Sequence, residues 1–219
     1  MRLPFTPAQF FDAFRQYNET VWPAQAILTA AAVLCLLLVV RPRPWAGPFI
    51  SAVLAFFWAW LALAYHLSFF ARINPLAYVF AAVSLTGAVL FFWFGVLRRS
   101  LRFSLHSRRT VAGLALIGYA LAIYPMLSIF TGHRYPAMPT FGLPCPTTIF
   151  TAGILAMGMR PMPRAVWIAP ILWSVVGFQG GFLLGVPQDF ALGAVLPVGI
   201  WAMLDRTGER QARAAAGPR

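Results

Sequence analysis

The chain has 219 residues, of which 60% are hydrophobic and only 10% are charged. A soluble domain averages about 25% charged residues, so this composition excludes a soluble enzyme and indicates an integral membrane protein. The formal charge is +12, all 17 basic residues are arginines, and the arginines fall mostly in short stretches between apolar runs. This placement is typical of the positive-inside rule and argues against a nucleic-acid partner, so membrane lipids are the expected surroundings.

The first 20 residues are polar and amphipathic, and they open with signals for the start of a helix. Thr6 is a suitable N-cap, Pro7 fits the first helical position, and Gln9 completes a capping box with Thr6. Aromatic residues then recur at helical spacing, at positions 10, 11, 14 and 17. We therefore expect residues 1–20 to form an amphipathic helix in the membrane interface, either as an anchor or as a lid over a site.

Residues 21–204 form seven apolar segments, which predicts an all-α polytopic membrane helix bundle. Most of these segments approach the ~20 residues that a spanning helix needs. Tryptophans lie near several segment ends, as in interfacial aromatic belts. The Arg-rich stretch at 205–219 is expected to be a cytoplasmic tail. The predicted segments are residues 21–40, 49–70, 76–97, 111–130, 147–159, 166–184 and 190–204.

The distribution of arginines supports seven crossings. With seven, 13 of the 17 arginines fall on one side, in the stretches at 41–43, 98–109 and 160–164 and in the tail, and 4 fall on the other. Six crossings would place the 98–109 loop and the tail on opposite sides. The positive-inside rule therefore predicts a bacterial cytoplasmic (inner) membrane protein with its N-terminus outside and its C-terminus in the cytoplasm.

The fifth segment is short and broken. It has only 13 residues from 147 to 159, which is about 20 Å of helix against a hydrocarbon core of about 30 Å. Prolines at 136, 139, 144 and 146 keep a regular helix from starting earlier. Irregular backbone at membrane depth must be buried in protein or line a cavity. Broken helices of this kind often form transporter binding sites, so we expect a polar pocket here.

Three possible metal ligands lie on the outer side at one predicted depth. His66, His133 and Cys145 together would suit a soft transition metal. Cys145 precedes the fifth helix, whose positive end would favour a thiolate. The two histidines alone could instead be axial ligands of a haem. The chain contains no closely spaced ligand pair such as CxxC or HxxxH, so the cofactor stays open.

Five further residues are candidates for binding a solute. Arg134 and Asp189 are the nearest charge partners, and an ion pair would neutralise both near the outer boundary. Asp189 could otherwise serve as a helix cap. Gln179 lies in GFQGGF, where glycines allow close helix approach and the amide can bond across it. Tyr135 and Asn74 complete the set.

Several strings in the chain resemble a known bacterial family. They are PFTPAQFFDAFRQYNETVWPAQ near the start, YHLSFFARINPLAYVF at 65–80, GHRYPAMPTFGLPCPTTIFTAG at 132–153, and GVPQDFAL. The chain is similar over nearly its whole length to a family of multi-span membrane proteins described only as a domain of unknown function. This resemblance supports the segment boundaries and implies no reaction, cofactor or site residue.

Four functions follow from these patterns. The broken helix beside a polar pocket favours a permease or binding protein for a small solute or soft metal ion. A haem or redox protein that uses His66 and His133 is the second. An intramembrane hydrolase would need more histidines on one side, so we lean against an enzyme. The fourth is an accessory subunit without chemistry, and assembly into an oligomer is compatible with all four.

Overall fold

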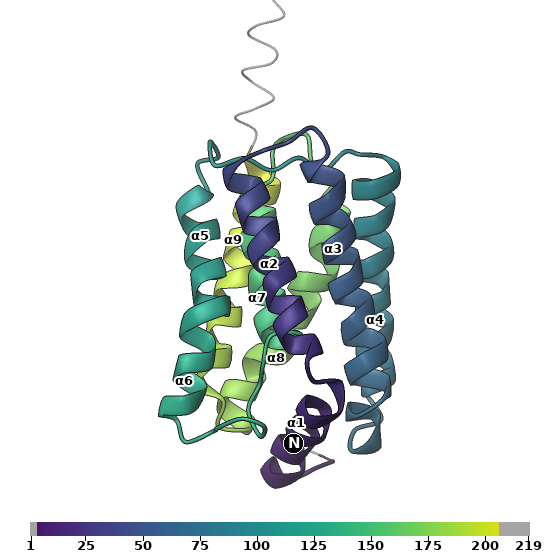
Figure 1. The fold of residues 1–219 in the computed structure, drawn as a ribbon, viewed down its shortest axis with the longest axis vertical. Helices are drawn as coiled ribbons and strands as arrows, with labels where there is room; N and C mark the ends of the chain where they lie inside the picture. Colours follow the sequence, from purple (N-terminus) through teal and green to yellow (C-terminus); the bar gives the residue numbers. More distant parts are fainter. Residues whose placement is uncertain (1–3, 206–219) are drawn as a thin grey trace, which may run out of the picture.

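The computed structural model describes residues 4–205, whose regular structure is helical. Figure 1 shows long helices running side by side along one axis, with α1 at one end. The α-helices are α1 (Pro7–Val21), α2 (Ala24–Val40), α3 (Ala46–Trp60), α4 (Ala77–Phe91), α5 (Thr110–Gly118), α6 (Tyr124–Phe130), α7 (Pro144–Ala156), α8 (Ile168–Leu183) and α9 (Val195–Leu204). The π-helical turns are η1 (Leu61–Leu67), η3 (Phe92–Leu97) and η4 (Tyr119–Ile123), and the 3-10 turns are η2 (Phe70–Arg72), η5 (Arg164–Trp167) and η6 (Pro187–Ala194).

Several helices are long and apolar enough to cross a membrane. Within the described chain there are 5 of them, at 46–72, 77–97, 110–130, 164–183 and 187–204, or up to 6 if α1 and α2 are counted as one bent span. α2 alone has 17 residues and α7 has 13. The predicted helical membrane bundle is therefore confirmed in outline. The predicted tail, apart from Asp205, lies outside the described residues.

α1 begins as its sequence predicts. The Gln9 amide N–H donates to Thr6 Oγ1 at 3.3 Å, and the Thr6 N–H donates to Gln9 Oε1 at 2.8 Å, which is the reciprocal pattern of a capping box. The helix then buries Phe14 and Tyr17 against the bundle and exposes Arg15. An 85° bend separates α1 from α2, so α1 crosses the end of the bundle and does not extend it.

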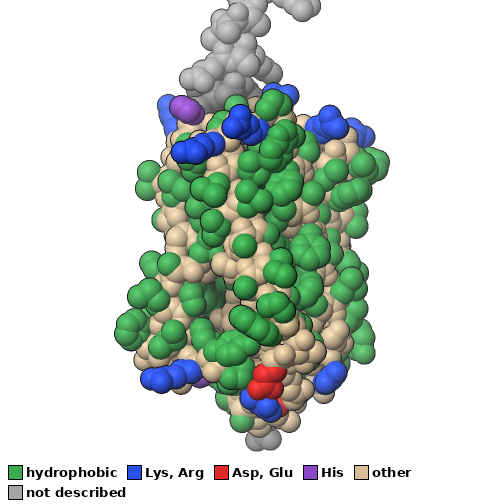
Figure 2. Space-filling model, viewed as in Figure 1, with side chains coloured by type: hydrophobic (Ala, Val, Ile, Leu, Met, Phe, Trp, Pro, Cys, Tyr) green, Lys and Arg blue, Asp and Glu red, His purple; other side chains and the backbone are tan. Residues whose placement is uncertain are grey.

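The Arg-rich loops gather at the end of the bundle opposite α1. There the Arg109 guanidinium donates to the carbonyls of Ala156 and Gly158, both at 3.0 Å, and pairs with Asp205 at 2.8 Å. Figure 2 shows basic side chains at both ends of the visible face and mainly hydrophobic side chains between them. The middle of that face has the apolar surface that contact with lipid requires.

α7 is the short helix predicted at the fifth segment, and it occupies the centre of the bundle (Figure 1). Every residue from Pro146 to Ala156 is buried. The helix begins at Pro144, three residues before the predicted start at 147, because proline is tolerated in the first turn of a helix. A Cβ at Gly153 would lie 2.7 Å from the Gly113 carbonyl oxygen, so α7 packs directly on the backbone of α5.

Candidate functional site

Three polar side chains from separate segments meet inside the half of the bundle nearest α1. Tyr124, Cys145 and Asp189 are called the polar centre. The Tyr124 hydroxyl donates to Asp189 Oδ1 at 2.5 Å, and the Cys145 thiol is in side-chain contact with both groups. Asp189 is only 3% exposed and forms no ion pair with any residue that the structure describes. The centre therefore contains a buried carboxyl group without a counter-charge among residues 4–205.

Each of these residues lies in the first turn of a helix. Tyr124 opens α6 directly after the π-helical turn η4, and Asp189 lies in the first turn of the 3-10 helix η6. Cys145 stands between two prolines in the first turn of α7. His66 belongs to a further irregular turn, the π-helical η1. Such π-helical turns are frequent at functional sites, and two of them, η1 and η4, adjoin the polar centre.

A second layer of hydrogen bonds holds η6 against α6. The Gln188 side-chain amide donates to Ser128 Oγ at 2.9 Å, and the Tyr119 hydroxyl donates to the Gln188 carbonyl at 2.9 Å. Both Gln188 and Ser128 are fully buried. Because these bonds act on the residue next to Asp189, they fix the carboxyl group in place.

His66 adds a buried imidazole on the other side of Trp173. The His66 and Trp173 ring centroids are 5.0 Å apart, and Trp173 in turn lies against the Cys145 thiol. His66 is 0% exposed, and neither ring nitrogen has a hydrogen-bond partner in the described protein. An unsatisfied buried polar group costs about 1–3 kcal/mol. The neighbourhood of the polar centre therefore has an unmet capacity for hydrogen bonding.

A small cavity adjoins the polar centre. Its volume is about 40 Å³, and by the same measure one water molecule needs ~10–15 Å³. In this conformation it has room for a water molecule or a small ion. Its lining residues come from α1, η1, η2, the 131–143 loop, α6, α7, α8 and η6, and they are Phe10, Phe14, Tyr65, Phe70, Tyr124, Pro139, Leu143, Pro144, Cys145, Pro146, Trp173 and Asp189.

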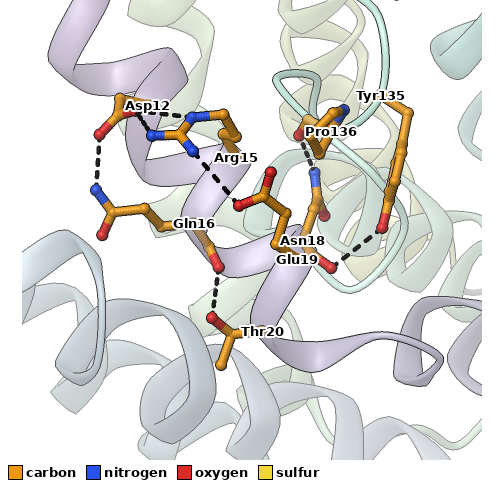
Figure 3. A network of polar contacts seen from close by, with 8 residues as sticks. All are labelled: Asp12, Arg15, Gln16, Asn18, Glu19, Thr20, Tyr135 and Pro136. Carbon is orange, nitrogen blue, oxygen red and sulfur yellow. Dashed lines mark hydrogen bonds and ion pairs between the residues drawn. The ribbon is translucent and has the colours of Figure 1, made fainter.

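α1 covers this cavity and is held by the 131–143 loop. Phe10 and Phe14 of α1 line the cavity. The buried Asn18 side chain donates to the Pro136 carbonyl at 2.7 Å, and the Tyr135 hydroxyl donates to the Asn18 carbonyl at 3.2 Å. Figure 3 shows these contacts joining α1 to the loop, beside a separate network of exposed charged residues on α1. The helix is thus bound to the loop that leads into α7.

Glycines in α8 allow η6 to approach closely. A Cβ at Gly180 would lie 2.8 Å from Asp189 Oδ2, and one at Gly177 would lie 2.5 Å from Leu192 Cδ1. The same added Cβ at Gly177 would lie 3.4 Å from Cys145 Sγ. The glycines predicted to serve helix packing therefore also shape the polar centre.

The structure does not bring the three predicted metal ligands together. His133 lies in the loop after α6, with its ring stacked on Phe11 at a centroid distance of 3.9 Å. His66 packs on Trp173, and only Cys145 belongs to the polar centre. Between positions 4 and 205, no group of three His, Cys, Asp or Glu side chains could hold a metal ion. For the haem hypothesis, the two histidine rings likewise pack against different aromatic partners.

The predicted solute-binding residues also separate. Asp189 is central, but it contacts Tyr124 and not Arg134, which is exposed. The expected ion pair between Arg134 and Asp189 is therefore absent from the described structure. Gln179 is exposed and donates to the Val175 carbonyl of its own helix at 3.3 Å, so it does not bond across the α8 interface.

The other two predicted residues serve local structure. The Asn74 side chain accepts from the Leu76 N–H at 3.0 Å, which organises the turn before α4. Tyr135 is half-exposed and fastens α1 through Asn18. Neither residue lines the small cavity.

Sequence reasoning missed Tyr124, Trp173 and Tyr65. Each is an aromatic residue inside an apolar segment, where the default expectation is packing. For Tyr124 a signal was present, because the next residue is Pro125, which lies inside the predicted span at 111–130. A proline inside a helix removes a backbone hydrogen bond, and the π-helical turn precedes it.

One family model covers all the residues of the polar centre. No curated protein and no solved structure matches the chain. A family model described as a family of unknown function (DUF6064) matches residues 7–214, which include α1, the polar centre and α9. This agrees with the resemblance seen in the sequence. The chain belongs to this family of unknown function.

Proposed function

We propose that the protein is a permease or binding protein for a small polar solute, and that the polar centre is its binding site. The carrying observation is the buried Asp189 carboxyl group, which has no ion-pair partner in the described chain and borders a cavity of about 40 Å³. An intramembrane carboxylate without a partner is costly and is by default a functional group. Its chemistry favours a cation or a hydrogen-bond donor.

The same proposal includes the topology. Seven crossings combine the 5 long apolar helices with α2 and α7. α7 is short, but it is surrounded by protein, so it need not match the full thickness of the bilayer. The positive-inside rule then assigns the Arg109 end to the bacterial cytoplasm and the α1 end to the outside. Under this orientation, the solute enters from the outer face.

α1 acts as a lid in this proposal. Phe10 and Phe14 separate the cavity from the end of the bundle. The bonds from Asn18 and Tyr135 attach α1 to the loop that precedes α7. Movement of α1 would therefore open the cavity and shift the segment that carries Cys145. A lid of this kind excludes water from the site until the solute binds.

The soft-metal version of the permease receives less support than the small-solute version. The described chain contains no cluster of three suitable ligands. The Cys145 thiol and the Asp189 carboxyl group can still interact with a cation at the polar centre. Asp189 is therefore the residue that the function test must address first.

Cys145 allows a direct test of access and charge. The protein has 2 cysteines, and Cys35 is fully buried, so a Cys35→Ala background leaves one thiol. We expect a small cationic methanethiosulfonate reagent to label Cys145 about tenfold faster than an anionic one, because the carboxylate concentrates cations. Asp189→Asn should remove this preference. Equal labelling rates for the two reagents in folded Cys35→Ala protein would contradict the proposal.

Uptake into proteoliposomes tests transport itself. The probes are radiolabelled methylammonium as a cation, urea as a neutral donor and sulfate as an anion. We expect uptake of methylammonium or urea above that of empty liposomes, and loss of it in Asp189→Asn, with sulfate at background. Uptake that is unchanged by Asp189→Asn would exclude the polar centre as the pathway. Charge-selective labelling without uptake would support a binding protein over a permease.

A further inference from the structure

A cleft at the Arg109 end of the bundle is a second candidate site, remote from the polar centre. Its volume is about 680 Å³, and it lies between the start of α3 and the loop after η3. Three exposed arginines line it, namely Arg43, Arg99 and Arg102. The rest of the wall is mainly apolar and is formed by Pro42, Pro44, Trp45, Ala46, Gly47, Pro48, Leu101, Phe103 and Met159.

The carboxylates of the described chain are engaged elsewhere. Two on α1 pair with Arg15, Asp205 pairs with Arg109, and Asp189 lies in the polar centre. The cleft therefore combines three guanidinium groups with no acidic residue in its lining. Such a set attracts anions, and guanidinium groups match the geometry of phosphate oxygens.

The backbone that carries these arginines is held in place. The Arg102 carbonyl accepts from the Met159 N–H at 2.8 Å. A Cβ at Gly47 would lie 2.4 Å from the Leu101 carbonyl oxygen, so the start of α3 touches the loop directly. Arg99 adopts a left-handed conformation with φ of 47°, which is uncommon outside glycine. The positions from which the arginine side chains project are therefore set before a ligand arrives.

We propose that this cleft binds the phosphate headgroup of an anionic phospholipid, such as phosphatidylglycerol. A lipid fits because the cleft joins a basic edge to an apolar wall, and because it lies at the end of the apolar band in which acyl chains would run. Trp45, which is 55% exposed at the mouth of the cleft, suits the headgroup region. The cleft shares no lining residue with the small cavity at the polar centre, so this lipid site is separate from the proposed solute pathway.

The test measures lipid binding to the purified full-length protein in a neutral detergent, by native mass spectrometry and by thermal unfolding. The probes are phosphatidylglycerol, phosphatidylcholine and inorganic phosphate. We expect phosphatidylglycerol to remain bound and to raise the unfolding temperature, while the other two have little effect. The combined change of Arg43, Arg99 and Arg102 to Gln should weaken phosphatidylglycerol binding by at least about tenfold, since surface arginines attract anionic lipid headgroups.

The matched control changes Arg41 and Arg108 to Gln, because both are exposed arginines of the same loops and neither lines the cleft. The control should keep its phosphatidylglycerol affinity within about twofold of the unmodified protein, as expected for arginines outside the site. If the triple variant does not fold, Arg102→Gln alone is measured. Equal losses in the two sets, or equal stabilisation by inorganic phosphate, would overturn the lipid assignment. Asp189→Asn should bind phosphatidylglycerol normally, which separates this result from the proposed function.

Discussion

Each end of the bundle buries one ionisable side chain, Arg109 at one end and Asp189 at the other, and the two have different partners. Arg109 is 2% exposed and meets two carbonyl oxygens at 3.0 Å as well as the Asp205 carboxylate at 2.8 Å. Asp189 is 3% exposed, accepts one hydrogen bond from the Tyr124 hydroxyl, and lies beside the Cys145 thiol. The first group has a counter-charge and several partners, whereas the second has no counter-charge among the described residues.

This difference separates a structural role from a functional one. Arg109 ties the end of α7 to the end of α9 through its bonds to Ala156 and Asp205. Buried charges that are fully paired in this way rigidify the elements that they join. Asp189 lies among π-helical and 3-10 turns and borders a cavity, which is the arrangement of a group that awaits a partner.

The largest effect is expected at Arg109. Arg109→Met removes the guanidinium, and with it the ion pair to Asp205 and the hydrogen bonds to the Ala156 and Gly158 carbonyls. We expect a loss of about 3–5 kcal/mol of stability, because removing one member of a largely buried ion pair is strongly destabilising. Thermal unfolding in detergent measures the loss. Arg108→Met, an exposed neighbour, is the control, and an equally large loss there would show that Arg109 has no special structural role.

The next effect is expected at Gly180, where α8 meets η6. Gly180→Ala introduces a Cβ 2.8 Å from Asp189 Oδ2, and such overpacking costs about 1–3 kcal/mol. It should also disturb the Tyr124–Asp189 hydrogen bond and alter Cys145 labelling. Gly118→Ala has no atom within 4 Å of the new Cβ, so it should be neutral or slightly stabilising. Unfolding and labelling of the two variants provide the comparison, and identical behaviour would refute the packing argument.

Asp189→Asn, unlike Arg109→Met, should leave the stability of the fold nearly unchanged. The amide keeps an oxygen that can accept from the Tyr124 hydroxyl, and it removes a buried ionisable group. We expect stability to change by less than about 1 kcal/mol or to rise, while charge-selective labelling of Cys145 disappears. A collapse of stability like that expected for Arg109→Met would place Asp189 among the structural residues instead.

The smallest effect is expected on the exposed face of α1. There the Arg15 guanidinium hydrogen-bonds the Asp12 carboxylate at 2.5 Å and lowers the pKa of Asp12 from its usual value of 3.8. An aspartate whose pKa is lowered by folding stabilises the fold at pH values above its unfolded-state pKa. This stabilisation is lost only as the pH falls through the folded-state pKa. Between about pH 5 and 8 the pair should therefore add no pH dependence.

Asp12→Asn provides the measurement for this surface pair. Because both partners are well exposed, solvent screens their interaction. The unfolding temperatures of the variant and the unmodified protein should agree across that pH range. A separation that grows between pH 5 and 8 would show that the α1 surface is coupled to a titrating group in the interior.

Much of the architecture could be predicted from the sequence. Apolar length and composition identify a membrane helix bundle, and a short helix was expected at the fifth segment, although α7 begins and ends three residues before the predicted bounds of 147 and 159. The capping box of α1 is readable because Thr6 and Gln9 are three residues apart. These features depend on local backbone chemistry, which neighbouring residues largely determine.

The tertiary structure, and not the sequence, decides which residues form the site. Sequence position indicates depth along a helix but not which helix faces which, so His133, His66 and Cys145 were predicted as one group. Packing instead places Tyr124 and Cys145 around Asp189, with Trp173 between Cys145 and His66. The physical reason is that helix rotation and neighbour choice arise from side-chain packing between segments far apart in the chain. Local sequence determines where each helix begins and ends, and only the assembled bundle decides which of its polar residues meet.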